Sequence, residues 1–281
     1  MDGRRTVVLR RTALRAAAGA LLTGAATGCA DGGRGAHAPQ GPRSAPEGPR
    51  SAPEPDGARQ AEGARQAEGP GRKAAAPRRF ASLPGQIEHG SRARPRVALT
   101  FGGEGDPALA LRVLADAERA GARLTVLAVG DWLDAHPEMA RRILDGGHEL
   151  GNHTQSHPDV NALDEARAYA EITDCARRLR RLTGSIGTWF RPSRSRRATP
   201  LVEDLARRAG YPHVLSYDVD SLDLTSPGVA AVTRKVTGEL RNGSVVSLHF
   251  GTRDTVAALP LLLTEIDRRG LRAVTATELF T

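Results

Sequence analysis

From about residue 94 onward, short runs of apolar and β-branched residues alternate with longer stretches in which apolar residues recur every three or four positions. The short runs are typical of buried strands, and the longer stretches are typical of helices with one apolar face. The pattern predicts strands at residues 96–101, 124–129, 189–190, 213–217, 245–250 and 272–274. It predicts helices at residues 107–121, 137–146, 163–182, 199–209, 228–240 and 256–269.

Repeated strand–helix units imply a parallel sheet, and this many of them imply an α/β fold with a closed or nearly closed barrel. Chemistry in such barrels lies at the C-terminal ends of the strands. Clusters of polar residues follow the predicted strands here, at residues 102–106, 152–159, 191–197 and 218–223 and at His249. The sequence therefore predicts a functional site at that end of the barrel.

Residues 1–29 have the pattern of an export signal. Basic residues come first, an apolar stretch follows at residues 16–26, and the segment ends at Cys29. This is the order of regions in a secretory signal peptide. Arg10 and Arg11 resemble the twin-arginine signal, and residues 26–29 resemble a lipobox in which Cys29 is acylated. We expect an exported envelope protein with a lipid anchor to the membrane through Cys29; the alternative is a soluble secreted protein.

Residues 30–93 are rich in Pro, Gly, Ala and Arg and contain two short tandem repeats, at residues 41–54 and 57–68. Such a composition cannot bury a core, which predicts a disordered linker before a single folded domain at residues 94–281. Fifteen Lys and Arg residues but eight Asp and Glu residues precede residue 94, so the net charge of +8 lies almost entirely there. The folded domain is close to neutral, which argues against nucleic-acid binding.

Two histidines provide the sharpest chemical signal. His153 and His157 lie four residues apart, at a strand end or on one helical turn, and Pro158 follows them. Two imidazoles at this spacing can converge on one divalent ion.

The sequence His-Glu-Leu-Gly-Asn-His-Thr-Gln-Ser-His at residues 148–157 resembles the second motif of the polysaccharide deacetylases, the NodB-homology domain of carbohydrate esterase family 4. Four further motifs of that family follow its order. They are Ala-Leu-Thr-Phe at residues 98–101, Phe-Arg-Pro at 190–192, Asp-Ser-Leu-Asp at 220–223 and Ser-Val-Val-Ser-Leu-His at 244–249.

The resemblance implies a deformed (β/α) barrel and a metal-dependent hydrolase that removes acetyl groups from polysaccharide, usually with zinc. It assigns His153 and His157 as metal ligands and His249 as the general acid, oriented by Asp223. The resemblance also implies that Arg191 faces the catalytic base and that Leu248 lines the pocket for the acetyl group. It implies that Asp220 binds substrate.

The first motif departs from the family pattern, because glycines stand at positions 102 and 103 where the family has two aspartates, the base and the third metal ligand. Three interpretations follow. Glu104, as the base, and Asp106, as a ligand, replace the missing carboxylates through an adaptable glycine-rich loop. Alternatively, a metal-bound hydroxide works with His249 alone, or the domain is an inactive protein that binds glycans. The substrate glycan and the oligomeric state do not follow from the sequence.

Overall fold

The computed structural model describes residues 72–281. The predicted signal segment with Cys29, and residues 30–71 of the predicted linker, lie outside the described residues.

Strand β2 (Arg96–Gly103) is the centre of a parallel sheet with strand order β4-β3-β2-β7-β6. Along its C-terminal half, β2 pairs with β3 on one side, and it pairs with β7 on the other. The first residues of β2 pair with β8. The other strands of this sheet are β3 (Thr125–Ala128), β4 (Glu149–Asn152), β6 (Val219–Asp220), β7 (Val245–His249) and β8 (Arg272–Ala273).

A second, short pair of strands continues the sheet toward closure. Strands β1 (Gln86–Ile87) and β5 (Val214–Leu215) are parallel to each other. Phe190 forms one bridge to Asn152 of β4 and another to Val214, and a bridge between residues 89 and 244 links the chain after β1 to the start of β7. The strands thus form a deformed, nearly closed barrel, as the sequence predicted.

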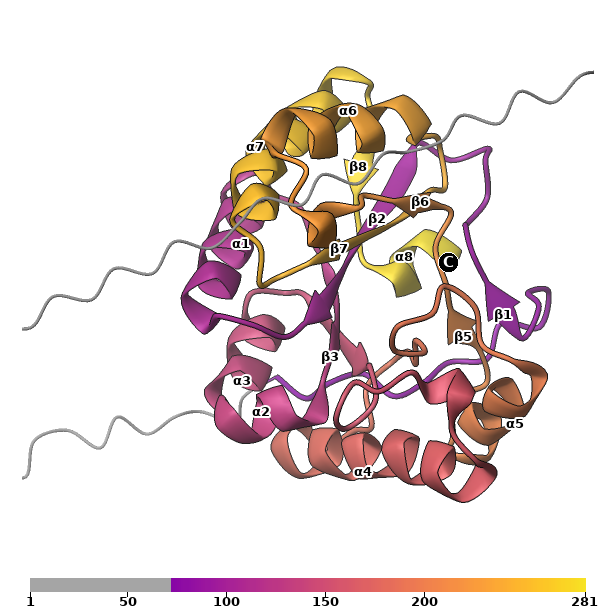
Figure 1. Cartoon of the computed structure of the whole chain (residues 1–281). Helices are drawn as coiled ribbons and strands as arrows, with labels where there is room; N and C mark the ends of the chain where they lie inside the picture. The colour runs from indigo at the N-terminus through magenta and orange to yellow at the C-terminus, as the bar shows by residue number, and fades with distance from the viewer. Residues whose placement is uncertain (1–71) are drawn as a thin grey trace, which may run out of the picture. The chain divides into compact units, whose positions relative to one another are not determined.

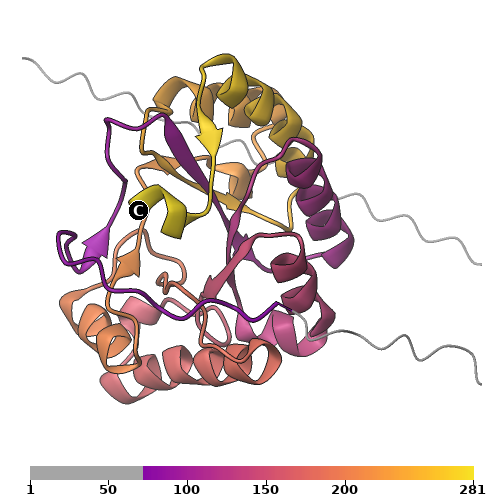
Figure 2. The ribbon, with the colours of Figure 1, turned by 180° about the vertical axis from the view of Figure 1, so that it is seen from behind.

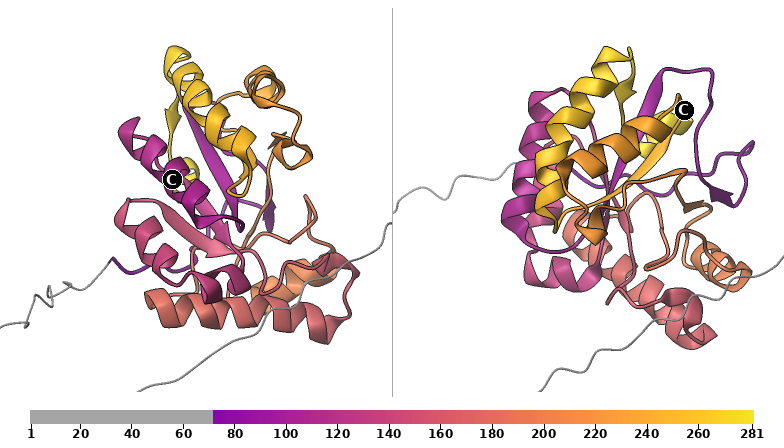
Figure 3. Two further views of the ribbon diagram at one scale, coloured as in Figure 1. Left: turned by 60° about the vertical axis from the view of Figure 1, so that its left-hand side comes forward. Right: turned by 45° about the horizontal axis from the view of Figure 1, so that its top comes forward.

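Helices pack around the strands, as Figures 1 and 3 show. Helix α7 packs against both α1 and α6, and α4 packs against α5. Their bounds are α1 (Pro107–Arg119), α2 (Gly130–Ala135), α3 (Glu138–Asp145), α4 (Glu165–Thr183), α5 (Pro200–Arg208), α6 (Val229–Glu239), α7 (Arg253–Arg268) and α8 (Ala276–Phe280). Two short 3-10 helices, η1 (Val160–Ala162) and η2 (Asp223–Thr225), lie in the loops.

Local sequence explains where several helices begin. Asp106, Asp164 and Thr199 each accept a hydrogen bond from a backbone amide in the first turn of the helix that follows. Such N-caps satisfy amides that have no partner inside the helix. Proline occupies the first turn of α1 and α5, where its missing amide costs nothing.

Apolar residues fill both sides of the barrel wall. One buried cluster lies between the sheet and the surrounding helices and includes Leu99, Val126 and Leu259. Another gathers residues of β1, β2, β3, β5 and β7 together with Trp189 and α8. The barrel interior is therefore packed with side chains along most of its depth and leaves only one end for a site.

Several elements differ from the sequence prediction. Residues 189–190 do not form a strand, because only Phe190 makes bridges. The region before residue 146 contains two helices, α2 and α3, where the periodicity predicted one from residue 137. Strands β1 and β6 and helix α8 were not predicted, since segments this short carry no periodic signal.

The predicted boundary of the folded domain at residue 94 is wrong. Ile87 is buried, Ala74 packs in the core, and the Phe80 ring stacks on Trp189 with 5.8 Å between ring centroids. Figure 2 shows the segment after residue 71 crossing the molecule to reach β1. The composition of residues 72–93 resembles that of the linker, but its few large apolar residues are used to cover the barrel.

A chain that begins at residue 94 is therefore expected to be less stable than one that begins at residue 72, by roughly 3 kcal/mol or more, because burial of Ile87 and Phe80 is lost. Urea unfolding followed by circular dichroism measures the difference. Equal unfolding midpoints for the two chains would contradict it.

His148 is a buried histidine directly before β4, and it makes the stability of the folded protein depend on pH. Its side chain has no exposed surface; Nδ1 accepts a hydrogen bond from the Leu124 amide, and Nε2 lies 3.3 Å from Glu118. Burial lowers the pKa of His148, although the Glu118 carboxylate partly opposes the shift. The unfolded chain therefore binds a proton at His148 more readily than the folded chain does.

We expect the neutral, buried form of His148 to contribute fully to the free energy of unfolding above a pH of about 6.5, the ordinary pKa of histidine. This contribution should be lost as pH falls below that value, by at most about 1.4 kcal/mol per pH unit. The free energy of unfolding of a His148→Gln variant should therefore fall less steeply between pH 7 and pH 5 than that of the natural chain. Parallel pH profiles of the two proteins would refute the prediction.

Among residues 72–281, no helix has both the length and the apolar character needed to cross a membrane.

Candidate active site

The polar clusters that follow the strands meet in one pocket at the C-terminal end of the barrel. The pocket has a volume of about 520 Å³. Its lining comes from segments far apart in the sequence, because the C-terminal ends of parallel strands share one edge of a sheet. Of the residues singled out in the sequence, the lining includes Glu104, His153, His157, Arg191, Asp220, Asp223 and His249.

His249 and Asp223 form the best-defined pair of the pocket. The Nδ1 atom of His249 lies 2.8 Å from Oδ1 of Asp223, and the His249 amide donates to Oδ2 at 2.8 Å. Asp223 has no exposed surface, and the Thr255 hydroxyl donates a further hydrogen bond to it. Two bonds to one carboxylate fix both the backbone and the ring of His249.

The electrostatics of the pair set the tautomer of the imidazole. Burial raises the pKa of Asp223, but the hydrogen bonds from His249 and Thr255 outweigh it, so the pKa lies below its usual value. An ionised Asp223 accepts a hydrogen bond from Nδ1–H, which leaves Nε2 as the ring nitrogen available to the pocket. In the protonated ring Nε2 also carries a proton, which the ring can deliver to a bound molecule.

The two histidines after β4 are held by a constrained loop. The Asn152 side chain accepts a bond from the Thr154 amide at 2.9 Å and donates to the Ile172 carbonyl and the Tyr211 hydroxyl. Thr154 and His157 adopt left-handed backbone conformations, with φ of 70° and 58°. Such conformations in residues other than glycine are concentrated at functional sites.

His153 and His157 lie side by side, with 4.9 Å between their ring centroids. Burial lowers the pKa of His153 well below its usual value and also lowers that of His157. Nδ1 of His153 bonds to the Arg191 carbonyl at 3.0 Å, and Nδ1 of His157 lies 3.5 Å from the Glu104 carboxylate. Two neutral imidazoles thus face the pocket, and Glu104 is the carboxylate nearest to them.

The donor set falls short of the metal site that the family resemblance implies. Within residues 72–281, no group of three His, Cys, Asp or Glu side chains is arranged to hold a metal ion. Catalytic zinc sites take three protein ligands. His153 and His157 supply two neutral imidazoles of the right chemistry, but Glu104, 3.5 Å from Nδ1 of His157, does not complete a three-ligand group with them, so the residues do not fit a three-ligand site.

The two glycines of the first motif have neighbours that occupy the space of a side chain. A Cβ at Gly102 would lie 2.8 Å from Cδ2 of His249, and a Cβ at Gly103 would lie 2.9 Å from the Cα of Ala128. Both distances are below ordinary van der Waals contact. The His249 ring and strand β3 have therefore closed over the positions where the family has carboxylates.

Asp106 is not placed as the predicted metal ligand. Its carboxylate caps α1 by accepting the Ala108 amide at 2.8 Å, and it is not part of the pocket lining. An Asp directly before a Pro at the start of a periodic helix is a capping signal. That signal is present in the sequence and agrees with the capping role that the structure shows.

Leu248 and Arg191 also differ from their predicted roles. Leu248 has no exposed surface and packs in the core outside the barrel, because neighbouring residues of a strand point to opposite faces and His249 faces the pocket. The Arg191 guanidinium donates to the carbonyls of Leu215 and Ser216 and to the Thr100 hydroxyl. None of these three described bonds of Arg191 is to a carboxylate.

Several lining residues were not among the predicted site residues. Tyr217 and Leu222 contribute to the wall of the pocket, and Arg194 and Arg196 line it from the loop after Phe190. Tyr217 follows the short strand β5, and Leu222 has a left-handed backbone with φ of 56°. Their position at strand ends was the available signal, but no sequence motif marks them.

Comparison with known proteins relates the chain to one family. The family model described as polysaccharide deacetylase matches residues 89–214. A peptidoglycan-N-acetylglucosamine deacetylase of Bacillus cereus is 31% identical over 187 residues, which cover 65% of this chain and 87% of that protein. A chitooligosaccharide deacetylase of Bradyrhizobium is 29% identical over 169 residues, which cover 52% of this chain and 73% of that protein.

The fold is shared with solved structures. A crystal structure described as a CE4 family pseudoenzyme from Bacillus anthracis superposes with a TM-score of 0.66 at 23% identity, covering 70% of this chain and 69% of that one. At this level of identity the similarity concerns the fold.

Proposed function

We infer the function of this protein from one premise: the chain belongs to the polysaccharide deacetylase family, whose members are hydrolases acting on carbon–nitrogen bonds. We propose that it removes acetyl groups from an N-acetylated envelope polysaccharide, either peptidoglycan or a chitin-like glycan. The observation that carries the proposal is the Asp223–His249 pair, with Nε2 directed to a pocket of about 520 Å³.

The reaction divides between two sides of the pocket. Glu104 is the base in this proposal: it takes a proton from water, whose oxygen then attacks the acetyl carbonyl carbon. His249 donates the proton at Nε2 to the nitrogen, the carbon–nitrogen bond breaks, and acetate and a free amine leave. Asp223 keeps the ring in place and stabilises the imidazolium that precedes proton donation.

No step is assigned to a metal ion, because the described residues supply two imidazoles without a third ligand. The family resemblance implies a divalent ion, usually zinc, so the assay of activity includes zinc and a chelator as separate conditions.

The test is release of acetate from N-acetylated oligosaccharides by the purified chain, measured for peptidoglycan fragments and for chitin oligomers. We expect release that requires both Glu104 and His249. A Glu104→Gln variant keeps the size of the side chain and removes the base, whereas Glu138→Gln changes an exposed carboxylate outside the pocket and serves as its control. Absence of acetate release from every glycan, with and without zinc, would defeat the proposal.

The environment of the two glycines in the first motif supports a second candidate function. The space above Gly102 and Gly103 is closed by His249 and by β3, so the two carboxylates of the family motif have no counterpart in those positions. We propose as the alternative an inactive protein that binds glycans through the same pocket. Retention of oligosaccharide binding by a protein that releases no acetate would establish it.

We also propose that the protein is exported to the cell envelope and anchored there by lipid on Cys29, as the sequence at residues 1–29 indicates. Its support is the order of basic, apolar and lipobox-like segments. Cell fractionation of a Cys29→Ala variant tests it, because an unanchored protein leaves the membrane fraction.

A further inference from the structure

We propose that Arg194 binds a carboxylate of the substrate, so that the protein acts on a carboxylate-bearing N-acetylated glycan in preference to a neutral one. This inference rests on the proposed function and chooses between its two substrate classes. It starts from the arginines that line the pocket, of which all but one are already held by other groups of the protein.

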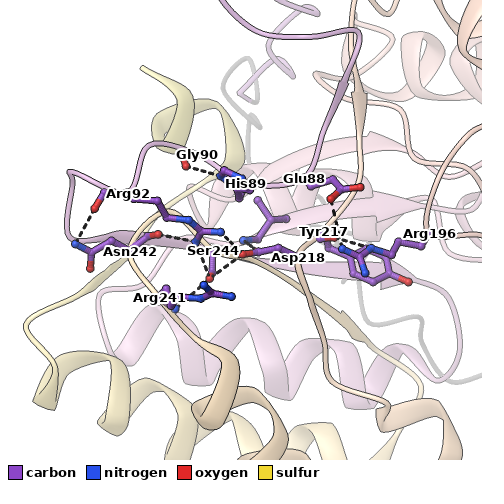
Figure 4. A network of polar contacts seen from close by, with 11 residues as sticks. Glu88, His89, Gly90, Arg92, Arg196, Tyr217, Asp218, Arg241, Asn242 and Ser244 are labelled. Atoms are coloured by element: carbon purple, nitrogen blue, oxygen red, sulfur yellow. Dashed lines mark hydrogen bonds and ion pairs between the residues drawn. The ribbon is translucent and has the colours of Figure 1, made fainter. Parts of the chain in front are cut away.

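The neighbouring arginines of the same loop are already engaged. Arg196 donates from Nε to the Tyr217 carbonyl at 3.0 Å, and its guanidinium carbon lies 5.6 Å from the centroid of the Tyr217 ring. Arg196 also pairs with Glu88 at 3.4 Å, as Figure 4 shows. Arg197 forms a second ion pair with Glu88. Both side chains are therefore held by the protein itself.

The carboxylates of the pocket are engaged as well. Glu104 lies beside His157, and Asp223 is bonded to His249. Asp220 accepts the Leu222 amide at 3.0 Å, which fixes the turn at that side of the pocket. Among residues 72–281, none of these three carboxylates forms an ion pair with Arg194.

Arg194 is the exception. It lines the pocket, its side chain is exposed, and within residues 72–281 it forms no hydrogen bond or ion pair. Its backbone has a φ of 56°, and the turn is held by the preceding Ser193, which is fully buried. The Ser193 hydroxyl contacts the Thr154 hydroxyl at 3.1 Å and donates to the Pro158 carbonyl.

This arrangement holds a cation at the pocket rim in a strained conformation. A left-handed backbone is unfavourable for a side chain as long as arginine, and such strain is concentrated at functional positions. A guanidinium presents two parallel N–H groups that match a carboxylate. A glycan with carboxylates next to its N-acetylated sugars would supply the missing partner, and an uncharged chitin-like strand would not.

The experiment uses the full chain and one oligosaccharide in two forms. The first is a peptidoglycan-type N-acetylated fragment with free carboxylates, and the second is the same fragment with those carboxylates converted to amides. Calorimetry gives Kd, and acetate release gives KM and kcat, each at low and at high salt. We expect the acidic form to bind about tenfold more tightly at low salt and to lose much of that preference at high salt.

Variants at Arg194 test whether this residue causes the preference for the acidic fragment. Asparagine tolerates a left-handed backbone, so Arg194→Asn should abolish the difference between the two fragments without unfolding the protein. Arg194→Lys should retain part of it, and Arg112→Asn, which removes an exposed charge outside the pocket, should leave it unchanged.

The outcomes separate this inference from the proposed function. Equal binding of the two fragments, or equal weakening of both by Arg194→Asn, overturns the role of Arg194 even if acetate is released. Selective binding of the acidic fragment that depends on Arg194, without acetate release from either, supports the inference and defeats the hydrolase.

Discussion

Replacing His249 with alanine is expected to lower acetate release by a factor of about 10² to 10⁴, the usual contribution of a positioned general acid. The imidazole is held by two bonds to the buried Asp223 and presents Nε2 to the pocket. No other described side chain of the pocket has a proton-donating nitrogen fixed by a carboxylate at 2.8 Å. Single-turnover assays with a soluble oligosaccharide measure the loss, and kcat should fall more than KM rises.

The matched control is His136→Ala, which removes a histidine outside the pocket. Its kcat should stay within a factor of about two of the natural value, because surface substitutions away from a site have small effects. Asp223→Asn gives a second comparison, since an amide at Oδ1 disfavours the tautomer with the proton on Nδ1. An activity that survives His249→Ala unchanged would remove His249 from the mechanism.

Replacing Arg191 with alanine is expected to cost about 3 kcal/mol or more of the free energy of unfolding. The side chain is 3% exposed and donates to the carbonyls of Leu215 in β5 and Ser216 after it, and to the Thr100 hydroxyl on β2. Burial lowers its pKa to about 10, while Tyr217 and Asp220 favour the charged form, so it remains a cation at neutral pH. Its loss leaves buried acceptors without a donor, each at a cost of about 1–3 kcal/mol.

Chemical unfolding followed by fluorescence measures this loss, and Arg194→Ala is the matched control. Arg194 lies three residues away and is exposed without a partner among the described residues, so its substitution should change stability by about 0.5 kcal/mol or less. The loss of unfolding free energy in Arg191→Lys should lie between those of Arg191→Ala and Arg194→Ala, because one ammonium group cannot replace the several N–H donors of a planar guanidinium. Similar unfolding midpoints for Arg191→Ala and Arg194→Ala would show that the buried guanidinium is not a structural tie between strands.

The sequence identified seven of the residues that line the pocket but not the contacts among them. His153, His157, Asp223 and His249 were found because strand ends and motif spacing are properties of the chain itself. In the sequence, both Glu104 and Asp106 were candidates to replace the missing carboxylates, and the structure gives them different positions. Asp106 is used by the first turn of α1, which leaves Glu104 beside His157.

The sequence by itself determined the α/β class and the order of the longer strands and helices, because periodicity acts over a few neighbouring residues. Tertiary structure decided the two-residue strands β1 and β6, the docking of residues 72–93, and the closure of His249 over Gly102. Each of these depends on segments distant in the chain: β1 exists only where β5 offers it a partner, and Ile87 is buried only where the barrel is open to receive it. Such contacts gain their free energy from surfaces that the folded barrel creates, and no local pattern encodes them.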